Sequence, residues 1–147
     1  MKIQMKILDK KNIKQIPQYG TAGSAAVDLS ACIESVEFLK PGECKLIGTG
    51  IAINVADPSY AALILPRSGL GHKKGLVLGN GTGLIDSDYQ GELMISCWNR
   101  SNSSYQIQPL ERIAQMIFLK IEHPKFELVD AFISTERGEK GFGSSGK

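Results

Sequence analysis

Sixteen glycines and six prolines interrupt the 147-residue chain so often that few stretches are left for a helix longer than two turns. Between these breaks, apolar and polar residues alternate with a period of two, which is typical of strands with one buried face. We predict strands at residues 2–8, 46–55, 61–65, 92–99 and 112–121. Many short strands separated by turns predict an all-β sandwich or barrel.

Two details of this assignment depend on competing patterns. Ile113, Met116 and Ile117 also fit a helical spacing, but the β-branched content of this run and its strand-rich neighbours favour a strand. Trp98 lies in an alternating run, so we predict that it packs in the core.

Length and composition limit the class of protein. The length and the 42% of hydrophobic residues predict one globular domain. The net charge of +2 and the scattered basic residues do not match the dense cationic face of a duplex-binding protein, so we expect no stable nucleic acid binding. The cysteines Cys32, Cys44 and Cys97 have no CxxC spacing, which favours a reducing compartment over a disulfide framework or a zinc site. The opening residues contain no apolar run of an export signal or membrane span, so we expect a cytoplasmic protein with no membrane partner.

Residues 83–91 place two carboxylates and a tyrosine between two glycines. If the segment is extended, Asp86 and Asp88 project to the same face, where they need a cation, a basic side chain or backbone donors nearby. The alternative is a turn in which the aspartates accept local backbone hydrogen bonds. The segment alone leaves turn and site equally open.

Two further segments suit an anion. Residues 66–71 combine Arg67 and Ser68 with two glycines after an apolar strand, and such a loop suits phosphate, although a turn with a solvated Arg67 is the simpler alternative. The tail from Arg137 onward is rich in glycine and serine around a lone Phe142, so we expect a flexible arm. Residues 141–147 superficially match a Walker loop, but the preceding strand and following helix that such a loop needs are missing from the pattern.

The sequence gives little support for metal binding by histidine. His72 and His123 lie far apart and neither has a second ligand at a helical spacing. A hard cation such as Mg²⁺ agrees better with the acidic segment, because Mg²⁺ is usually held by one or two carboxylates together with substrate phosphates.

Taken together and in order, five segments resemble the five motifs of the homotrimeric deoxyuridine triphosphatase (dUTPase) family, bacterial type. They are residues 24–29, 66–71, 79–91, 111–116 and 137–146. The resemblance implies an all-β fold, a jelly-roll-like distorted β-barrel that assembles as a homotrimer with active sites between subunits. It divides the chain into a β-barrel domain at residues 1–136 and a flexible C-terminal lid arm at residues 137–147.

The resemblance also implies a reaction. A nucleotide diphosphohydrolase of this family converts dUTP and water to dUMP and pyrophosphate by Mg²⁺-assisted attack of water on the α-phosphorus, which limits uracil incorporation into DNA and supplies dUMP. Asp86 matches the residue that activates the water. Asp28 would hold Mg²⁺ through water, with the metal bound mainly by substrate phosphates.

Residue by residue, the same resemblance implies a substrate site with two sides. The residues expected to bind the phosphates are Arg67, Ser68, Gly69, Gln115, Arg137, Ser144 and Ser145. The residues expected to bind the base and the sugar are Asn80, Gly83, Leu84, Ile85, Tyr89, Met94 and Phe142. The backbone of a hairpin at residues 78–85 would read uracil, Tyr89 would exclude a 2'-hydroxyl, and Phe142 would stack on the base.

Two other functions fit the same resemblance less well. A dCTP deaminase needs a general base beside the amino-bearing carbon, and no glutamate lies in the expected hairpin. A non-catalytic nucleotide-binding protein would not need the carboxylate of Asp86. The chain departs from the family pattern at Ala26 and Val27, where packing changes, and at Lys140, which places a cation in the arm.

Overall fold

The computed structural model describes residues 1–13, 16–139 and 141, and these residues form an antiparallel β protein with 41% strand and 5% helix. One sheet contains, in spatial order, β1 (Gln4–Ile7), β4 (Cys44–Asn54), β8 (Glu92–Asn99) and β6 (Leu76–Leu78). The second contains β2 (Val27–Ser30), β10 (Arg112–Lys120), β5 (Tyr60–Pro66) and β7 (Gly83–Ile85). The all-β, jelly-roll-like fold predicted from the sequence is confirmed.

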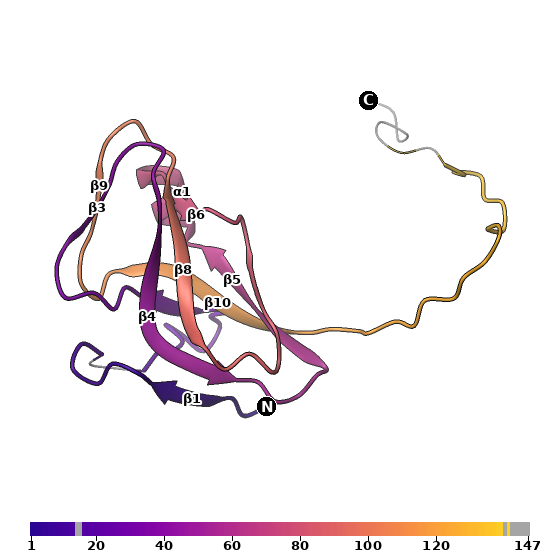
Figure 1. Ribbon diagram of the computed structural model, residues 1–147, viewed down its shortest axis with the longest axis horizontal. Helices are drawn as coiled ribbons and strands as arrows, with labels where there is room; N and C mark the ends of the chain where they lie inside the picture. Colours follow the sequence, from indigo (N-terminus) through magenta and orange to yellow (C-terminus); the bar gives the residue numbers. More distant parts are fainter. Residues whose placement is uncertain (14–15, 140, 142–147) are drawn as a thin grey trace.

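Two smaller elements complete the body. Strands β3 (Glu37–Leu39) and β9 (Tyr105–Ile107) form a separate two-stranded sheet, and the short helix α1 (Ser68–Lys74) connects β5 to β6. In Figure 1, the long strands β4 and β8 run side by side, with β5 and β10 in the second layer and α1 at the end near β6. No helix within the described part of the chain is long and apolar enough to cross a membrane.

The core lies between the two sheets, and β8 illustrates how it is built. Leu93, Ile95 and Cys97 are buried and alternate with side chains that are exposed or partly exposed, as the period of a strand requires. Trp98 belongs to the outward set and is 39% exposed, so the prediction that it packs in the core is wrong. Asn99 is buried but donates hydrogen bonds to the carbonyl oxygens of Leu39 (2.9 Å) and Ser103 (2.8 Å), so its amide nitrogen is satisfied.

The five predicted strands appear as β1, β4, β5, β8 and β10, with ends shifted by a few residues. The ambiguous run at residues 112–121 is therefore a strand, paired with β2 and β5 along most of its length. The hairpin expected at residues 78–85 does not form, because its two arms do not pair with each other. Instead, β6 (the first arm) pairs with β8, and β7 (the second arm) pairs with β5. A tight turn crosses from one sheet to the other, with the amide of Gly81 donating to the Leu78 carbonyl at 3.2 Å.

The C-terminal part leaves the packed body after β10. Residues 122–139 contain no helix or strand and are exposed, and Figure 1 shows this segment running away from the sheets. Its apolar residues Phe126, Leu128 and Phe132 are more than nine-tenths exposed. The division into residues 1–136 and 137–147 stays a prediction, since only part of the arm lies within the described residues.

Candidate active site

Asp28 is the centre of a charged cluster formed by three strand ends. Arg67 Nε donates to Asp28 Oδ1 at 2.8 Å, and Arg112 Nη1 donates to Asp28 Oδ2 at 3.0 Å. Arg67 Nη1 also donates to the backbone carbonyl of Arg112 at 3.0 Å. The guanidinium of Arg67 is therefore fixed on two sides, and the Arg67 side chain is only 27% exposed, so the alternative of a solvated Arg67 is wrong.

Strand register brings Gln115 to the same place. Gln115 lies opposite Asp28 on β2 and opposite Leu65 on β5, and its Nε2 donates to the carbonyl oxygen of Pro66 at 2.9 Å. Asp28, Arg67 and Arg112 are called the Asp28 cluster below. The bond to Pro66 fixes the Gln115 amide beside this cluster. Residues 28, 67 and 115, distant in sequence, are thus adjacent in the fold.

Ser68 and Gly69 open helix α1 directly after Arg67, where the sequence had predicted only a loop. The helix is short and has no side-chain hydrogen bond at its N-terminal cap. An added Cβ at Gly69 would meet no protein atom within 4 Å, so packing within the chain does not require glycine there. A ligand that approaches the backbone closely would require it.

These residues line one cavity of about 740 Å³, within the size range of small-molecule sites. Its lining includes Asp28, Arg67, Ser68, Gly69, Lys73, Lys74 and Gln115. Three cations face a single carboxylate, which already pairs with Arg67. The cavity, called the polyphosphate cavity below, therefore suits a polyanion.

Arg112 was not among the predicted site residues, although it lies in the fourth motif. Its neighbour Glu111 fixes the turn before β10: the Glu111 carboxylate accepts hydrogen bonds from the hydroxyl of Tyr105 and from the amide of Gln108 at 2.9 Å. Burial, and then the hydrogen bond to Glu111, raises the pKa of Tyr105, so the phenol remains a donor. Nothing in the local sequence reveals that Arg112 pairs with Asp28, because this contact depends on the pairing of β10 with β2.

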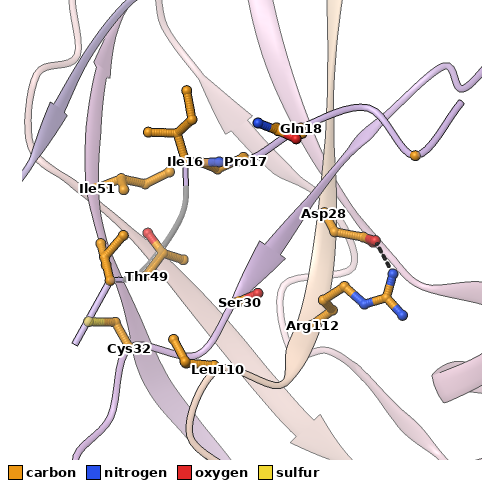
Figure 2. Close-up of a pocket in the computed structure, with 12 residues that line it drawn as sticks. Ile16, Pro17, Gln18, Asp28, Ser30, Cys32, Thr49, Ile51, Leu110 and Arg112 are labelled. Atoms are coloured by element: carbon orange, nitrogen blue, oxygen red, sulfur yellow. Dashed lines mark hydrogen bonds and ion pairs between the residues drawn. The ribbon is translucent and has the colours of Figure 1, made fainter. Parts of the chain in front are cut away.

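A second cavity, of about 450 Å³, lies on the other side of the Asp28 cluster. Figure 2 shows Asp28 and Arg112 pointing toward each other at one side of this cavity, with Ile16, Ile51 and Leu110 around the rest. Asp28 lines both cavities, whereas Arg112 lines only this one and Arg67 and Gln115 line only the polyphosphate cavity, so the Asp28 cluster lies between the two spaces.

The acidic segment is a turn. After β7, the amide of Tyr89 donates to the carbonyl of Asp86 at 3.2 Å, so Asp86 and Asp88 do not share the face of an extended strand. The segment is therefore a turn and the extended arrangement is wrong, but within the described residues neither aspartate side chain accepts the local backbone hydrogen bond that the turn alternative included. Both carboxylates are exposed at the end of β7, where a ligand or a second chain can reach them.

Tyr89 is folded back onto its own chain. Its hydroxyl donates to the carbonyl of Glu92 at 2.9 Å. A Cβ added to Gly91 would lie 2.4 Å from the Tyr89 hydroxyl oxygen, so glycine allows the ring to lie there. Tyr89 as a whole remains 43% exposed, so its ring is accessible to a ligand.

The other predicted base-side residues follow the same pattern of exposure. Asn80, Leu84 and Met94 are exposed, whereas Gly83 and Ile85 are partly buried. No described cavity contains both these residues and those of the polyphosphate cavity. Arg137 is exposed, and Phe142, Ser144 and Ser145 lie outside the described residues.

The donor set fits Mg²⁺ only in a substrate complex. Within residues 1–13, 16–139 and 141, no three His, Cys, Asp or Glu side chains gather as a metal site. Both oxygens of Asp28 already accept hydrogen bonds from arginine. Mg²⁺ would therefore take most of its ligands from phosphate and water, as it often does in proteins.

A two-sheet antiparallel fold with a cationic cavity and an exposed acidic turn defines an all-β protein that binds a phosphorylated small molecule. The dUTPase family model matches residues 12–146. The deoxyuridine 5'-triphosphate nucleotidohydrolases of Francisella philomiragia and Francisella tularensis subsp. holarctica are 63% and 61% identical over 99% of both chains. The dUTPase of Staphylococcus bacteriophage 80alpha, solved with dUPNHPP, has a TM-score of 0.87 and 31% identity over 99% of both chains. This chain belongs to the dUTPase family.

Proposed function

We propose that this protein converts dUTP and water to dUMP and pyrophosphate. The observation that carries the proposal is the cationic cavity around Arg67, Ser68 and Gln115, in a chain that belongs to the dUTPase family. The curated relatives are named for this activity, and this chain aligns with almost their whole length.

The triphosphate binds in the polyphosphate cavity. Arg67 presents a guanidinium already oriented by Asp28, and charge-assisted hydrogen bonds from such a group to phosphate are strong and directional. Ser68 and Gly69 add a hydroxyl and an unobstructed backbone, and Gln115 adds an amide. Because these groups are fixed before binding, little of the interaction energy is lost in ordering them.

Asp86 is proposed to orient and deprotonate the attacking water. The oxygen of that water bonds to the α-phosphorus, the bond from the α-phosphorus to the bridging oxygen breaks, and pyrophosphate leaves. The proton passes to the Asp86 carboxylate and then to solvent. A carboxylate is a weak base, so positioning and charge neutralisation supply much of the rate.

Base and sugar selection are assigned to residues 78–89. The turn between β6 and β7 presents backbone groups that can pair with uracil, while Tyr89 lies beside Asp86 and limits the space at the 2'-position. Asn80, Gly83, Leu84, Ile85 and Met94 complete this side of the site. Phe142, with Arg137, Ser144 and Ser145, would close over the bound nucleotide.

The site is proposed to be shared between copies in a homotrimer. The polyphosphate cavity of one chain contains no residue of the segment that includes Asp86 and Tyr89. A second copy that brings its acidic turn to this cavity would complete the site, and the arm of a third copy would cover it.

Magnesium is proposed as the cofactor, held by the phosphates and by water next to Asp28. Bound there, Mg²⁺ supplies charge neutralisation on the triphosphate. The cysteines at positions 32, 44 and 97 are free, which agrees with a cytoplasmic enzyme. The proposed role of the enzyme is to limit uracil incorporation into DNA and to supply dUMP.

Hydrolysis in water enriched with oxygen-18 tests the bond that breaks. Attack on the α-phosphorus places the label in dUMP, whereas attack on the β-phosphorus places it in pyrophosphate. Mass spectrometry of both products distinguishes these results. Label in pyrophosphate, or no hydrolysis of dUTP, would contradict the proposal.

A further inference from the structure

A second cationic surface lies next to the polyphosphate cavity. A groove of about 520 Å³ runs between the C-terminal half of α1 and the loop after β8. Four basic residues line it, namely His72, Lys73, Lys74 and Arg100, together with Ser101, Ser103 and Ser104. The groove lining contains no acidic residue.

The positive charge of this groove is not neutralised within the chain. In the part of the chain that the structure describes, no carboxylate oxygen lies within 4.0 Å of a side-chain nitrogen of Lys73, Lys74 or Arg100. The carbonyl end of α1 attracts cations, but this effect is weak at an exposed position. An anion in the groove would offset the remaining repulsion among these charges.

The two walls of the groove are rigidly joined. The amide of Arg100 donates to the carbonyl of Gly75 at 3.0 Å. Gly75 has a φ of 74°, and an added Cβ would lie 2.9 Å from the amide nitrogen of Ser101, so only glycine fits. Ser101 Oγ in turn donates to Oδ1 of the buried Asn99 at 2.8 Å. The cations are therefore presented by a fixed frame, which lowers the entropic cost of binding.

Lys73 and Lys74 connect this groove to the polyphosphate cavity, because both residues line both spaces. Arg100 lines only the groove. We propose that the groove is a second phosphate-binding site that accepts pyrophosphate as it leaves the polyphosphate cavity. The choice of pyrophosphate as the ligand rests on the proposed function.

Calorimetric titration of pyrophosphate into the full-length protein tests this assignment. The protein is first saturated with α,β-imido-dUTP, which fills the polyphosphate cavity and is not hydrolysed. We expect one further pyrophosphate per chain. Arg100→Gln should weaken this binding about tenfold, since it removes one charge-assisted contact. Arg100→Lys should restore most of the affinity.

Two other variants test whether the charge of the groove itself is responsible. Lys120→Gln removes an exposed lysine at the end of β10, away from the groove, and should bind pyrophosphate like the wild type. Ser104→Asp adds a negative charge at an exposed position in the groove and should abolish binding.

The proposal is overturned if no pyrophosphate binds beyond the analogue, or if Arg100→Gln and the wild type bind equally. A single-stranded oligonucleotide that binds this groove more tightly than pyrophosphate would also overturn it. Failure of the proposed function appears separately, as a wild-type protein that does not hydrolyse dUTP.

Discussion

The phosphate side of the candidate site is held by ionic side-chain contacts, whereas the base side consists of the short strand β7, the turns on either side of it and Met94 on β8, and is largely exposed. On the phosphate side, Arg67 is bound at 2.8 Å to Asp28 and at 3.0 Å to the Arg112 carbonyl. On the base side, Asp86 is exposed, and backbone hydrogen bonds hold its turn: the Tyr89 amide donates to the Asp86 carbonyl at 3.2 Å, and the Ala56 amide donates to the Ser87 carbonyl at 3.0 Å.

This difference matches what each side is proposed to recognise. Phosphates carry charge that must be met by cations in a fixed geometry, and the strand pairing within one chain provides it. Uracil is neutral and can be read by backbone groups, whose geometry a turn fixes without side-chain support. An exposed turn also remains available to a neighbouring copy, which agrees with the proposed shared site.

The largest expected effect comes from Asp86→Asn. The amide cannot accept the proton of the attacking water, so kcat should fall by about 10² to 10⁴, while dUTP binding is retained. Single-turnover kinetics and equilibrium binding measure the two effects. Asp88→Asn changes a second exposed carboxylate in the same turn and should keep kcat near the wild-type value. Equal losses in both variants would mean that the turn has no specific base.

Deleting the chain after Glu136 should reduce kcat by about 10², because the arm is proposed to close the site and hold the triphosphate in position. The packed strands end at Lys120, so the melting temperature of the truncated protein should not change. Differential scanning calorimetry serves as the control. Full activity after truncation would remove the arm from the site.

Tyr89→Ala should lower the preference for dUTP over UTP about thirtyfold, because the ring no longer limits the space at the 2'-position. The ratio of kcat/KM for the two substrates measures the effect. Tyr89→Phe loses only the hydrogen bond to Glu92 and should keep the preference. An unchanged ratio in Tyr89→Ala would assign sugar selection to another residue.

Asp28→Asn tests whether the phosphate side is oriented in advance. The neutral amide leaves two guanidinium groups without their shared carboxylate, so KM for dUTP should rise about tenfold. The cluster is partly exposed, and the free energy of unfolding should fall by only about 1 kcal/mol. Asp130→Asn, in the exposed C-terminal segment, should change neither value. An unchanged KM in Asp28→Asn would mean that Asp28 does not orient the phosphate side in advance, so the two sides would not differ in this respect.

Sequence reasoning was most successful where local pattern decides the structure. Alternation located five strands, including the ambiguous run that became β10. It failed where long-range pairing decides. Trp98 alternates correctly, but the alternation does not say which face is buried, and residues 78–85 become a crossing between sheets because β6 and β7 find different partners.

The site shows the same limit. Arg67, Ser68 and Gln115 were predicted as phosphate ligands and line one cavity. Arg112 was missed because its role depends on the register of β10 against β2. The extended geometry expected for Asp86 and Asp88 was wrong because a backbone turn competes with alternation in a segment of small and polar residues.

The most direct test of the central claim is pyrophosphate release from dUTP, UTP, dCTP and dTTP, each with Mg²⁺ and with EDTA, by the wild type and by Asp86→Asn. We predict rapid release from dUTP alone, lost in EDTA and in Asp86→Asn. No release from dUTP by the wild type, with the nucleotide still bound, would contradict the account and indicate a non-catalytic nucleotide-binding protein on the same fold.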